Sequence, residues 1–220
     1  MSLPPSARTE SSVDADTVDA DAWRDRATGA IVGAFIGDAM AMGCHWVYDH
    51  SKFVDLYGER VDTYLKPRAD GFHADLEAGQ YSQTSEICVL LLESLVEKGE
   101  LDQEDFNSRF DKMLGSCDGQ RGGSGRYTPR DICDVYRGRI IEKKEWGKVA
   151  CGGTDSGDTL GRAALIGVRY AADMPKVAAL AKEHVALQVS CPAVQCHAIA
   201  VALLTALFVR GEPFDSTVGP

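Results

Sequence analysis

The segment GAIVGAFIGDAMAMGCHWVYD, residues 29–49, joins a stretch of small and apolar residues to a polar and aromatic end. Gly29, Gly33 and Gly37 recur every four residues within it, and this spacing places them on one face of a helix. We therefore expect a helix whose glycine face lets another backbone approach closely. The apolar run is about 14 residues long and ends at Asp38, so it is too short to cross a bilayer.

The later apolar stretches also follow the helical period. One begins near Ile87 and stops at Lys98-Gly99, a basic residue followed by the glycine that commonly ends a helix. No stretch shows the sustained alternation expected of a β-strand. The sequence therefore predicts an all-α fold, and the other predicted helices lie within residues 106–114, 131–141, 162–170, 176–189 and 185–209.

The range 185–209 approaches the length of a membrane span. It carries Gln188, Pro192, Gln195 and His197 along its length, which is unusual for a lipid-facing helix. We interpret it as a buried core helix and expect no membrane association.

Charge and cysteine content exclude other classes of protein. The chain has 33 acidic and 23 basic residues and a formal net charge of −10, the wrong sign for neutralising nucleic-acid phosphates. We expect no nucleic-acid partner. The seven cysteines are an odd number and lie among apolar neighbours, which is typical of reduced thiols in an intracellular protein. The predicted location is the cytoplasm.

The first 21 residues differ in character from the rest of the chain. They contain Pro4, Pro5 and five acidic residues against one arginine, with too little apolar surface to offset the entropy lost on ordering. We expect a disordered acidic leader over residues 1–21. No internal repeat or linker divides the remainder, so residues 22–220 are predicted to form a single helical domain.

Three polar segments lie next to apolar helices, at residues 37–49, 79–86 and 153–158. Helix N-termini present free N–H groups that favour phosphate or carboxylate ligands, so these segments could border one binding pocket. The alternative is ordinary helix capping, in which Ser82, Thr84, Asp155 and Thr159 satisfy the first amides of their helices.

The order of these motifs resembles that of the ADP-ribosylglycohydrolase superfamily, especially its crystallin-like branch. Residues 29–49 resemble the first family motif, a Gly-Asp-Ala turn on a glycine-rich helix. The segment GQYSQTSEICVLLLESL, residues 79–95, resembles the second, a Ser/Thr-Asp-Asp-Thr run that opens a buried helix. GRAALIG, residues 161–167, resembles the small-residue helix after the third motif.

The resemblance implies an all-α orthogonal helical bundle with a central cleft. In the family this cleft holds two magnesium ions, binds ADP-ribose attached to a protein side chain and hydrolyses the linkage. Magnesium prefers hard oxygen ligands in octahedral geometry. The implied cofactor is therefore Mg²⁺, and the implied partner is ADP-ribose or an ADP-ribosylated protein.

Carried over residue by residue, the resemblance assigns three sets of side chains. The implied catalytic residues are Asp38 and His45. The implied substrate contacts are Trp46, Tyr48, Asp155, Asp158 and Arg162, and the implied magnesium ligands are Ser82, Gln83, Thr84 and Glu86.

The sequence departs from the family pattern at several of these positions. Gln83 and Thr84 stand where the family has paired aspartates, so two negative charges that attract a divalent cation are missing. His45 stands where many members have a glutamate; a neutral histidine there is either a base or a structural residue. The chain ends at Pro220, before the family's further Asp-x-Asp-Thr run, and we expect the domain to be incomplete at its C-terminus.

Two functional hypotheses remain open. The first is an ADP-ribosylglycohydrolase-like hydrolase with a degenerate metal motif. The second is a non-catalytic relative, either a structural protein of the crystallin kind or an ADP-ribose-binding protein. We expect a monomer in both cases, and dependence on magnesium separates the two hypotheses.

Overall fold

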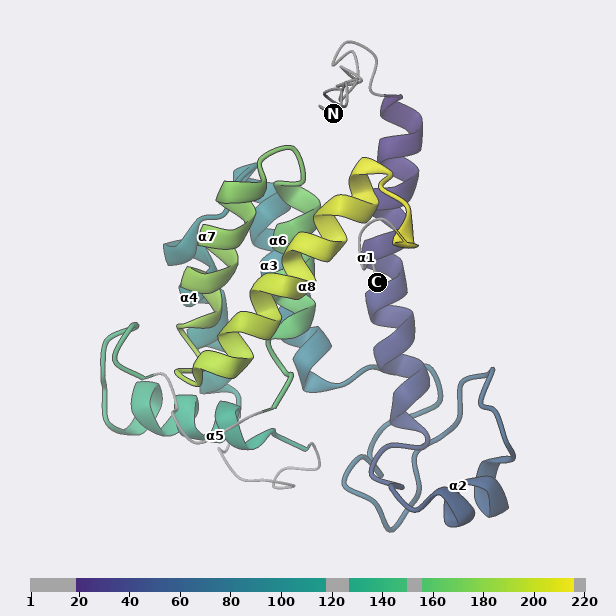
Figure 1. The fold of residues 1–220 in the computed structure, drawn as a ribbon. Coiled ribbons are helices and arrows are strands. Elements are labelled where there is room, and N and C mark those ends of the chain that lie inside the picture. The colour runs from purple at the N-terminus through teal and green to yellow at the C-terminus, as the bar shows by residue number, and fades with distance from the viewer. Residues whose placement is uncertain (1–18, 118–126, 150–155, 216–220) are drawn as a thin grey trace, which may run out of the picture.

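The computed structural model describes residues 19–117, 127–149 and 156–215 (Figure 1). Within these ranges the regular elements are helices and no β-strand forms, so the predicted all-α fold is confirmed. The elements in chain order are α1 (Ala20–Met42), α2 (His50–Tyr57), α3 (Gln83–Lys98), α4 (Gln103–Gly115), α5 (Arg130–Tyr136), the π-helix η1 (Arg137–Ile141), α6 (Leu160–Arg169), α7 (Met174–Val185) and α8 (Pro192–Arg210).

The core lies where α6, α7 and α8 pack together, with α3 and α4 on its other side (Figure 1). Small residues make this packing close. Ala198, Ala202 and Ala206 of α8 are fully buried. A Cβ added at Gly167 of α6 would come within 2.2 Å of the carbonyl oxygen of Ala202. Gly167 therefore allows α6 and α8 to approach each other closely.

The predicted close approach along the glycines of α1 is wrong. A Cβ added at Gly29, Gly33 or Gly37 would meet no described atom within 4 Å. Between these glycines, Val32 is 47% exposed and Ile36 is 42% exposed. The helix contacts α6 and α8 through its opposite face, and it stands at the edge of the bundle (Figure 1). The glycine spacing correctly predicted one helical face, but not which face is packed.

The helix predicted within residues 185–209 is displaced by several residues. Helix α7 ends at Val185, and α8 begins only at Pro192, which fits the first turn of a helix because proline needs no N–H partner there. By length and composition α8 is the one described helix that could cross a membrane. Of its most apolar 18-residue stretch, 28% is buried inside the protein. The core helix of a soluble protein satisfies the same criterion, and α8 packs against both α6 and α7.

The start of α1 corrects the predicted leader at its C-terminal end. Asp19 caps α1 by accepting hydrogen bonds from the backbone N–H groups of Asp21 and Ala22. The helix therefore includes residues 20 and 21, which we had expected to be disordered. Residues 1–18 lie outside the described part of the chain.

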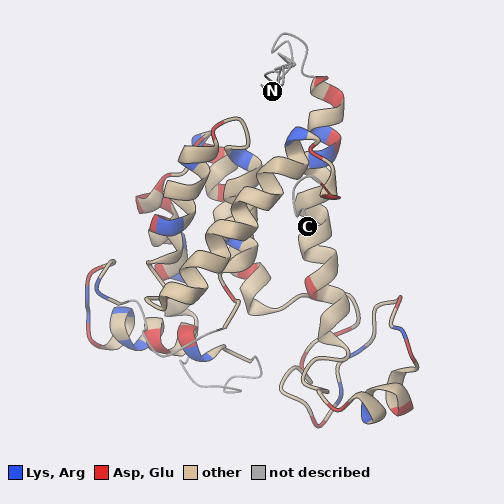
Figure 2. Cartoon of the chain, viewed as in Figure 1, with Lys and Arg blue, Asp and Glu red and all other residues tan. Residues whose placement is uncertain are grey.

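Helix α2 and the segment that follows it were not predicted. The helix is eight residues long, is capped by Asp49 and buries no side chain, so it adds nothing to the hydrophobic core. With residues 58–82 it forms a lobe below α1, separate from the main bundle (Figure 1). Charged residues are frequent in this lobe, whereas α8 and the middle of α1 carry few (Figure 2).

Candidate functional site

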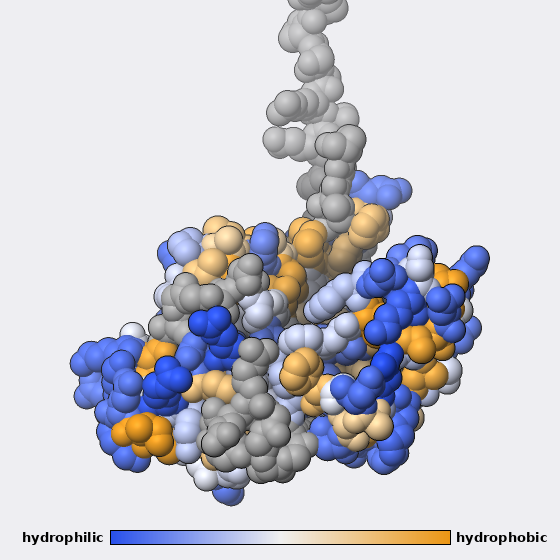
Figure 3. Space-filling view, turned by 90° about the horizontal axis from the view of Figure 1, so that it is seen from below, coloured by the Kyte–Doolittle hydropathy of each residue, from blue (hydrophilic) through white to orange (hydrophobic). Residues whose placement is uncertain are grey.

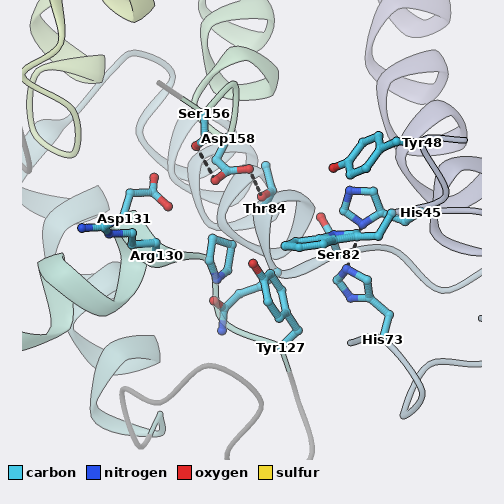
Figure 4. Close-up of a pocket in the computed structure, with 13 residues that line it drawn as sticks. His45, Tyr48, His73, Ser82, Thr84, Tyr127, Arg130, Asp131, Ser156 and Asp158 are labelled. Atoms are coloured by element: carbon cyan, nitrogen blue, oxygen red, sulfur yellow. Dashed lines mark hydrogen bonds between the residues drawn. The ribbon is translucent and has the colours of Figure 1, made fainter. Parts of the chain in front are cut away.

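A cavity of about 460 Å³ lies between the lobe and the main bundle. The segment after α1, the N-terminus of α3, the residues before α5 and the residues before α6 all contribute to its wall (Figure 4). The structure therefore brings together the described parts of all three polar segments, as the sequence predicted. The lining residues are His45, Trp46, Tyr48, His73, Ser82, Gln83, Thr84, Tyr127, Pro129, Arg130, Asp131, Ser156 and Asp158.

Aromatic rings form one side of this pocket. Trp46 lies 4.7 Å from Phe72 and 5.8 Å from Tyr127, measured between ring centroids. Tyr48 is 83% exposed at the rim. Such rings offer flat apolar faces against which a base or a sugar can stack. The molecular face turned to the viewer in Figure 3 interleaves hydrophobic with hydrophilic residues.

Two histidines meet on the same side of the pocket. Nδ1 of His45 lies 3.0 Å from Nε2 of His73, and the two rings stack with their centroids 5.0 Å apart (Figure 4). Desolvation at the pocket wall, followed by the neighbouring His73, lowers the pKa of His45, although Asp38 and Asp158 act in the opposite direction. The pocket wall therefore favours the neutral form of His45, in which one ring nitrogen can accept a hydrogen bond or a proton.

Asp38 lies behind the pocket wall and does not line the pocket. Its carboxylate accepts the backbone N–H of Ser82 at 2.7 Å and the Ser82 hydroxyl at 3.0 Å. These bonds tie the C-terminal part of α1 to the N-terminus of α3, where a carboxylate is also favoured by the helix dipole. The predicted catalytic residue Asp38 is thus engaged in a structural contact.

The four predicted magnesium ligands are divided between two cavities. Ser82, Gln83 and Thr84 line the main pocket, and Glu86 lines a second cavity of about 370 Å³, which Gln83 also borders. The Ser82 hydroxyl donates to Asp38, and the Thr84 hydroxyl donates to Asp158 at 3.4 Å. The side-chain amide of Gln83 donates to Thr128 at 3.5 Å.

These four residues do not fit a magnesium site. Their only carboxylate is Glu86, and it does not line the main pocket that Ser82, Gln83 and Thr84 share. The side-chain oxygen of Gln83 is buried and accepts no hydrogen bond from the part of the chain that the structure describes, but it carries no formal charge. A hard divalent cation is held mainly by carboxylate charge, which the main pocket does not receive from this set.

Asp131 and Asp158 meet on the opposite wall, and the sequence identified only the second of them. Asp131 is 1% exposed, and Asp158 lies close enough for its charge to act on Asp131. Asp158 also accepts the hydroxyl of Ser156 at 2.6 Å (Figure 4). Burial, followed by the charge of Asp158, raises the pKa of Asp131 to about 6. The missed signal is an acidic residue on the apolar face of α5, next to buried Ile132.

Arg162, a predicted substrate contact, is buried behind the pocket and does not line it. It is 1% exposed and donates to Gln188, which in turn donates to Asp131. Its guanidinium lies over the Phe106 ring, 5.4 Å from the centroid. Burial lowers its pKa. Arg162 reaches the pocket only through this chain of hydrogen bonds.

The other predicted substrate contacts lie at or near the pocket where they are described. Trp46, Tyr48 and Asp158 line it, whereas Asp155 lies outside the described residues. His73, Tyr127 and Asp131 line the pocket but were not predicted. His73 and Tyr127 belong to segments without helical period, so no pattern in the sequence linked them to the three motifs.

Comparison with known proteins agrees with the fold and with the order of the motifs. The chain is similar to Crystallin J1A of Tripedalia cystophora, with 27% identity over 95 residues, which make up 43% of this chain and 30% of the crystallin. The aligned part thus spans less than a third of that relative. A sequence profile of the ADP-ribosylglycohydrolase family matches residues 19–219. The chain belongs to the ADP-ribosylglycohydrolase family.

Proposed function

We propose that the main pocket binds the ADP-ribosyl group of a modified protein side chain and that the protein hydrolyses the bond to that side chain. Membership of the family supports a hydrolase-like function. The observation that carries the proposal is that one pocket holds both stacking surfaces and groups that transfer protons. Trp46 and Tyr127 supply the stacking surfaces, and His45 and Asp158 supply the proton-transfer groups.

The volume and chemistry of the pocket suit such a ligand. Small-molecule sites commonly have volumes of about 300–1,000 Å³, and the pocket volume of about 460 Å³ falls in this range. The aromatic rings of Trp46 and Tyr127 are suited to stack against the adenine or a ribose face. Arg130 lines the pocket and supplies the positive charge that a diphosphate requires.

Magnesium has no step in this proposal. Among the residues at the second family motif the single carboxylate is Glu86, and it does not line the main pocket. We propose instead that side chains of the pocket carry the acid–base chemistry. Binding and hydrolysis are then expected to persist in the presence of a magnesium chelator.

The second function is a non-catalytic one, either structural or limited to binding ADP-ribose. It is favoured by the contact between Asp38 and Ser82, which occupies both carboxylate oxygens of a predicted catalytic residue. The similarity to Crystallin J1A also favours a non-catalytic function, because that relative is named as a crystallin. In this case ADP-ribose either stabilises the fold without turnover or has no effect.

The experiment is a thermal melt of the purified chain with ADP-ribose, with and without magnesium, followed by a hydrolysis assay on a mono-ADP-ribosylated peptide. A ligand at one hundred times its Kd stabilises the folded state by about 2.7 kcal/mol. Trp46→Ala is expected to abolish the shift, whereas Phe214→Ala, a matched change at an exposed ring that does not line the pocket, leaves it intact. A shift with peptide turnover supports the hydrolase; a shift without turnover supports the binding protein. The absence of any shift contradicts both ligand-binding proposals.

A further inference from the structure

His45 and His73 contact each other through their ring nitrogens, although 28 positions separate them in the sequence. Nδ1 of His45 lies 3.0 Å from Nε2 of His73, which is within hydrogen-bonding range (Figure 4). A neutral imidazole has one nitrogen that donates and one that accepts, so one of the two facing nitrogens carries the proton and the other receives it. The contact therefore restricts which nitrogen of His45 is protonated.

His73 is held firmly enough to act as such a partner. Its side chain is 7% exposed, and its carbonyl oxygen accepts the backbone N–H of Leu76 at 3.0 Å. Leu76 is itself buried, so the turn that carries His73 is anchored in the lobe. The Tyr127 ring, from the segment before α5, meets the His73 ring edge-on with the centroids 5.0 Å apart. His73 is thus fixed both by its own turn and by a ring from the main bundle.

The turn that carries His45 has an unusual backbone. Trp46 adopts a φ of 69°, in the left-handed region that bulky residues rarely enter. A Cβ added at Gly43, at the start of the same turn, would overlap Leu65, so the lobe packs closely against this turn. Strained backbone of this kind persists only where the surrounding structure imposes it, and it is frequent at functional sites. The strain is an independent sign that the positions of His45 and Trp46 matter.

The orientation of the proton decides what His45 offers to a ligand. An ordinary imidazole is already mostly neutral above pH 7. If Nδ1 of His45 carries the proton and donates it to His73, Nε2 of His45 is left as an acceptor. This Nε2 makes no hydrogen bond to the part of the chain that the structure describes, and the ring lines the main pocket. The opposite tautomer would present an N–H group, which cannot act as a base.

We propose that His73 is a positioning residue, which accepts a hydrogen bond from Nδ1 of His45 and thereby keeps Nε2 of His45 unprotonated and directed at the bound ligand. This inference rests on the proposed hydrolase function, because that function uses His45 as a proton-transfer group. His45 is then a catalytic residue, and His73 acts only through it.

The chemical step in which His45 takes part is the attack of water. The water oxygen forms a bond to the anomeric carbon, and Nε2 of His45 takes one proton from this water. The bond between the anomeric carbon and the protein side chain breaks, and the departing atom keeps the bonding electron pair and takes a proton from the solvent. His45 then returns its proton to the solvent, so the net reaction consumes one water molecule. The hydrogen bond to His73 is retained throughout.

The competing explanation is that His73 only packs against His45. The two rings are stacked, with their planes 27° apart, and such packing could be supplied by another ring of similar size. Two substitutions separate the explanations. His73→Phe keeps a ring and removes the acceptor, whereas His73→Gln removes the ring and keeps a polar group near the position of Nε2.

The first part of the test detects the hydrogen bond in the wild type. The protein is labelled with ¹⁵N in its histidine rings and studied by NMR at about pH 7.5, where an ordinary imidazole is mostly neutral. A chelator is present, so that no metal ion links the rings. We expect a through-hydrogen-bond coupling between Nδ1 of His45 and Nε2 of His73, with the proton on Nδ1 of His45. His73→Phe should lose this coupling, and His50→Phe, at an exposed histidine of the same lobe, should retain it.

The second part measures single-turnover hydrolysis of a mono-ADP-ribosylated peptide over a range of enzyme concentrations. His73→Phe is expected to lower the maximal rate by up to about 100-fold, the cost of misplacing a reacting group by about 1 Å. The enzyme concentration that gives half of the maximal rate should stay the same, because the stacking surfaces are intact. His73→Gln is expected to recover most of the rate, and His50→Phe should match the wild type.

The outcomes distinguish this inference from the proposed function. If the wild type shows no coupling, or if the proton lies on Nε2 of His45, the proposed role of His73 is overturned. It is also overturned if His73→Phe hydrolyses the peptide at the wild-type rate, or if His73→Gln recovers none of the loss. If the coupling is present but the wild type does not hydrolyse the peptide, the proposed hydrolase function fails together with the catalytic role of His45, while the hydrogen bond and its tautomer are supported. The NMR measurement on the wild type needs no variant, so poor folding of a variant does not decide the result.

Discussion

Ser82 donates two hydrogen bonds to the carboxylate of Asp38, one from its backbone N–H at 2.7 Å and one from its hydroxyl at 3.0 Å. Forty-four residues separate the two positions, and the contact joins α1 to the N-terminus of α3. It therefore fixes the wall of the main pocket from behind.

Replacing Asp38 by Ala is expected to destabilise the fold by about 1–3 kcal/mol, because both donors of Ser82 lose their acceptor. Urea unfolding monitored by circular dichroism gives the difference. Asp55→Ala, an exposed acidic position on α2, is the matched control and is expected to change stability by less than about 0.5 kcal/mol. Equal stability of the two variants would contradict a structural role for Asp38.

Gly167→Ala is expected to destabilise the protein by about 1–3 kcal/mol or more, because the added Cβ would overlap the carbonyl oxygen of Ala202 on α8. Gly33→Ala is the matched change on α1, where the Cβ meets no described atom. It is expected to stabilise the helix by about 0.5–1 kcal/mol. Denaturant midpoints of the two variants should move in opposite directions, and a loss of stability in both would show that the glycine face of α1 is packed in solution.

Asp131→Asn is expected to change the pH dependence of stability. The pKa of Asp131 is raised from 3.8 to about 6 in the folded state, so the folded protein binds the proton more tightly than the unfolded chain. Folding stability from this group is present below pH 3.8 and is lost as the pH rises through 6. The shift corresponds to about 3 kcal/mol.

The Asp131→Asn variant does not lose folding stability from this position as the pH rises. Relative to the wild type, it should therefore gain stability between pH 4 and pH 8, by up to the same amount. Taking the difference between the two proteins at each pH cancels the titration of groups that do not interact with Asp131. A difference that stays constant from pH 4 to pH 8 would mean that Asp131 is ionised normally.

Arg162→Lys is expected to cost about 1–3 kcal/mol, because lysine lacks the planar fork that donates to Gln188 and lies over Phe106. The change should also release the orientation of Gln188 and so raise the pKa of Asp131 further, because the hydrogen bond from Gln188 favours the ionised carboxylate. Thermal unfolding and an infrared titration of the aspartate carboxyl groups measure the two effects separately. An unchanged titration with reduced stability would limit Arg162 to packing.

The helices of the core could be predicted from sequence because their apolar residues repeat at helical spacing. The end of α3 at Lys98-Gly99 is an example, since Gly99 adopts the left-handed conformation with φ of 75°. The packed face of α1 could not be predicted, because glycine spacing defines a face without saying what covers it. The true close approach, at Gly167, depends on the path of α8 and has no local signature.

Only part of the pocket could be predicted, because only some of its residues lie next to helices that the sequence pattern indicates. Residues in motifs next to helix ends, such as Trp46 and Asp158, were identified by their position. His73 reaches the pocket from the irregular segment after α2, where no period exists to be read. Asp131 could not be predicted from the sequence. Its pKa is raised by burial and by the charge of Asp158, which lies 27 positions along the chain.

The most direct measurement is single-turnover hydrolysis of a mono-ADP-ribosylated peptide in the presence of a magnesium chelator, with the wild type and Asp158→Asn compared. We predict that the wild type releases ADP-ribose under these conditions and that the variant is about 100-fold slower. Release of ADP-ribose only when magnesium is restored, or equal rates for the two proteins, would contradict the proposal that side chains of this pocket perform the chemistry.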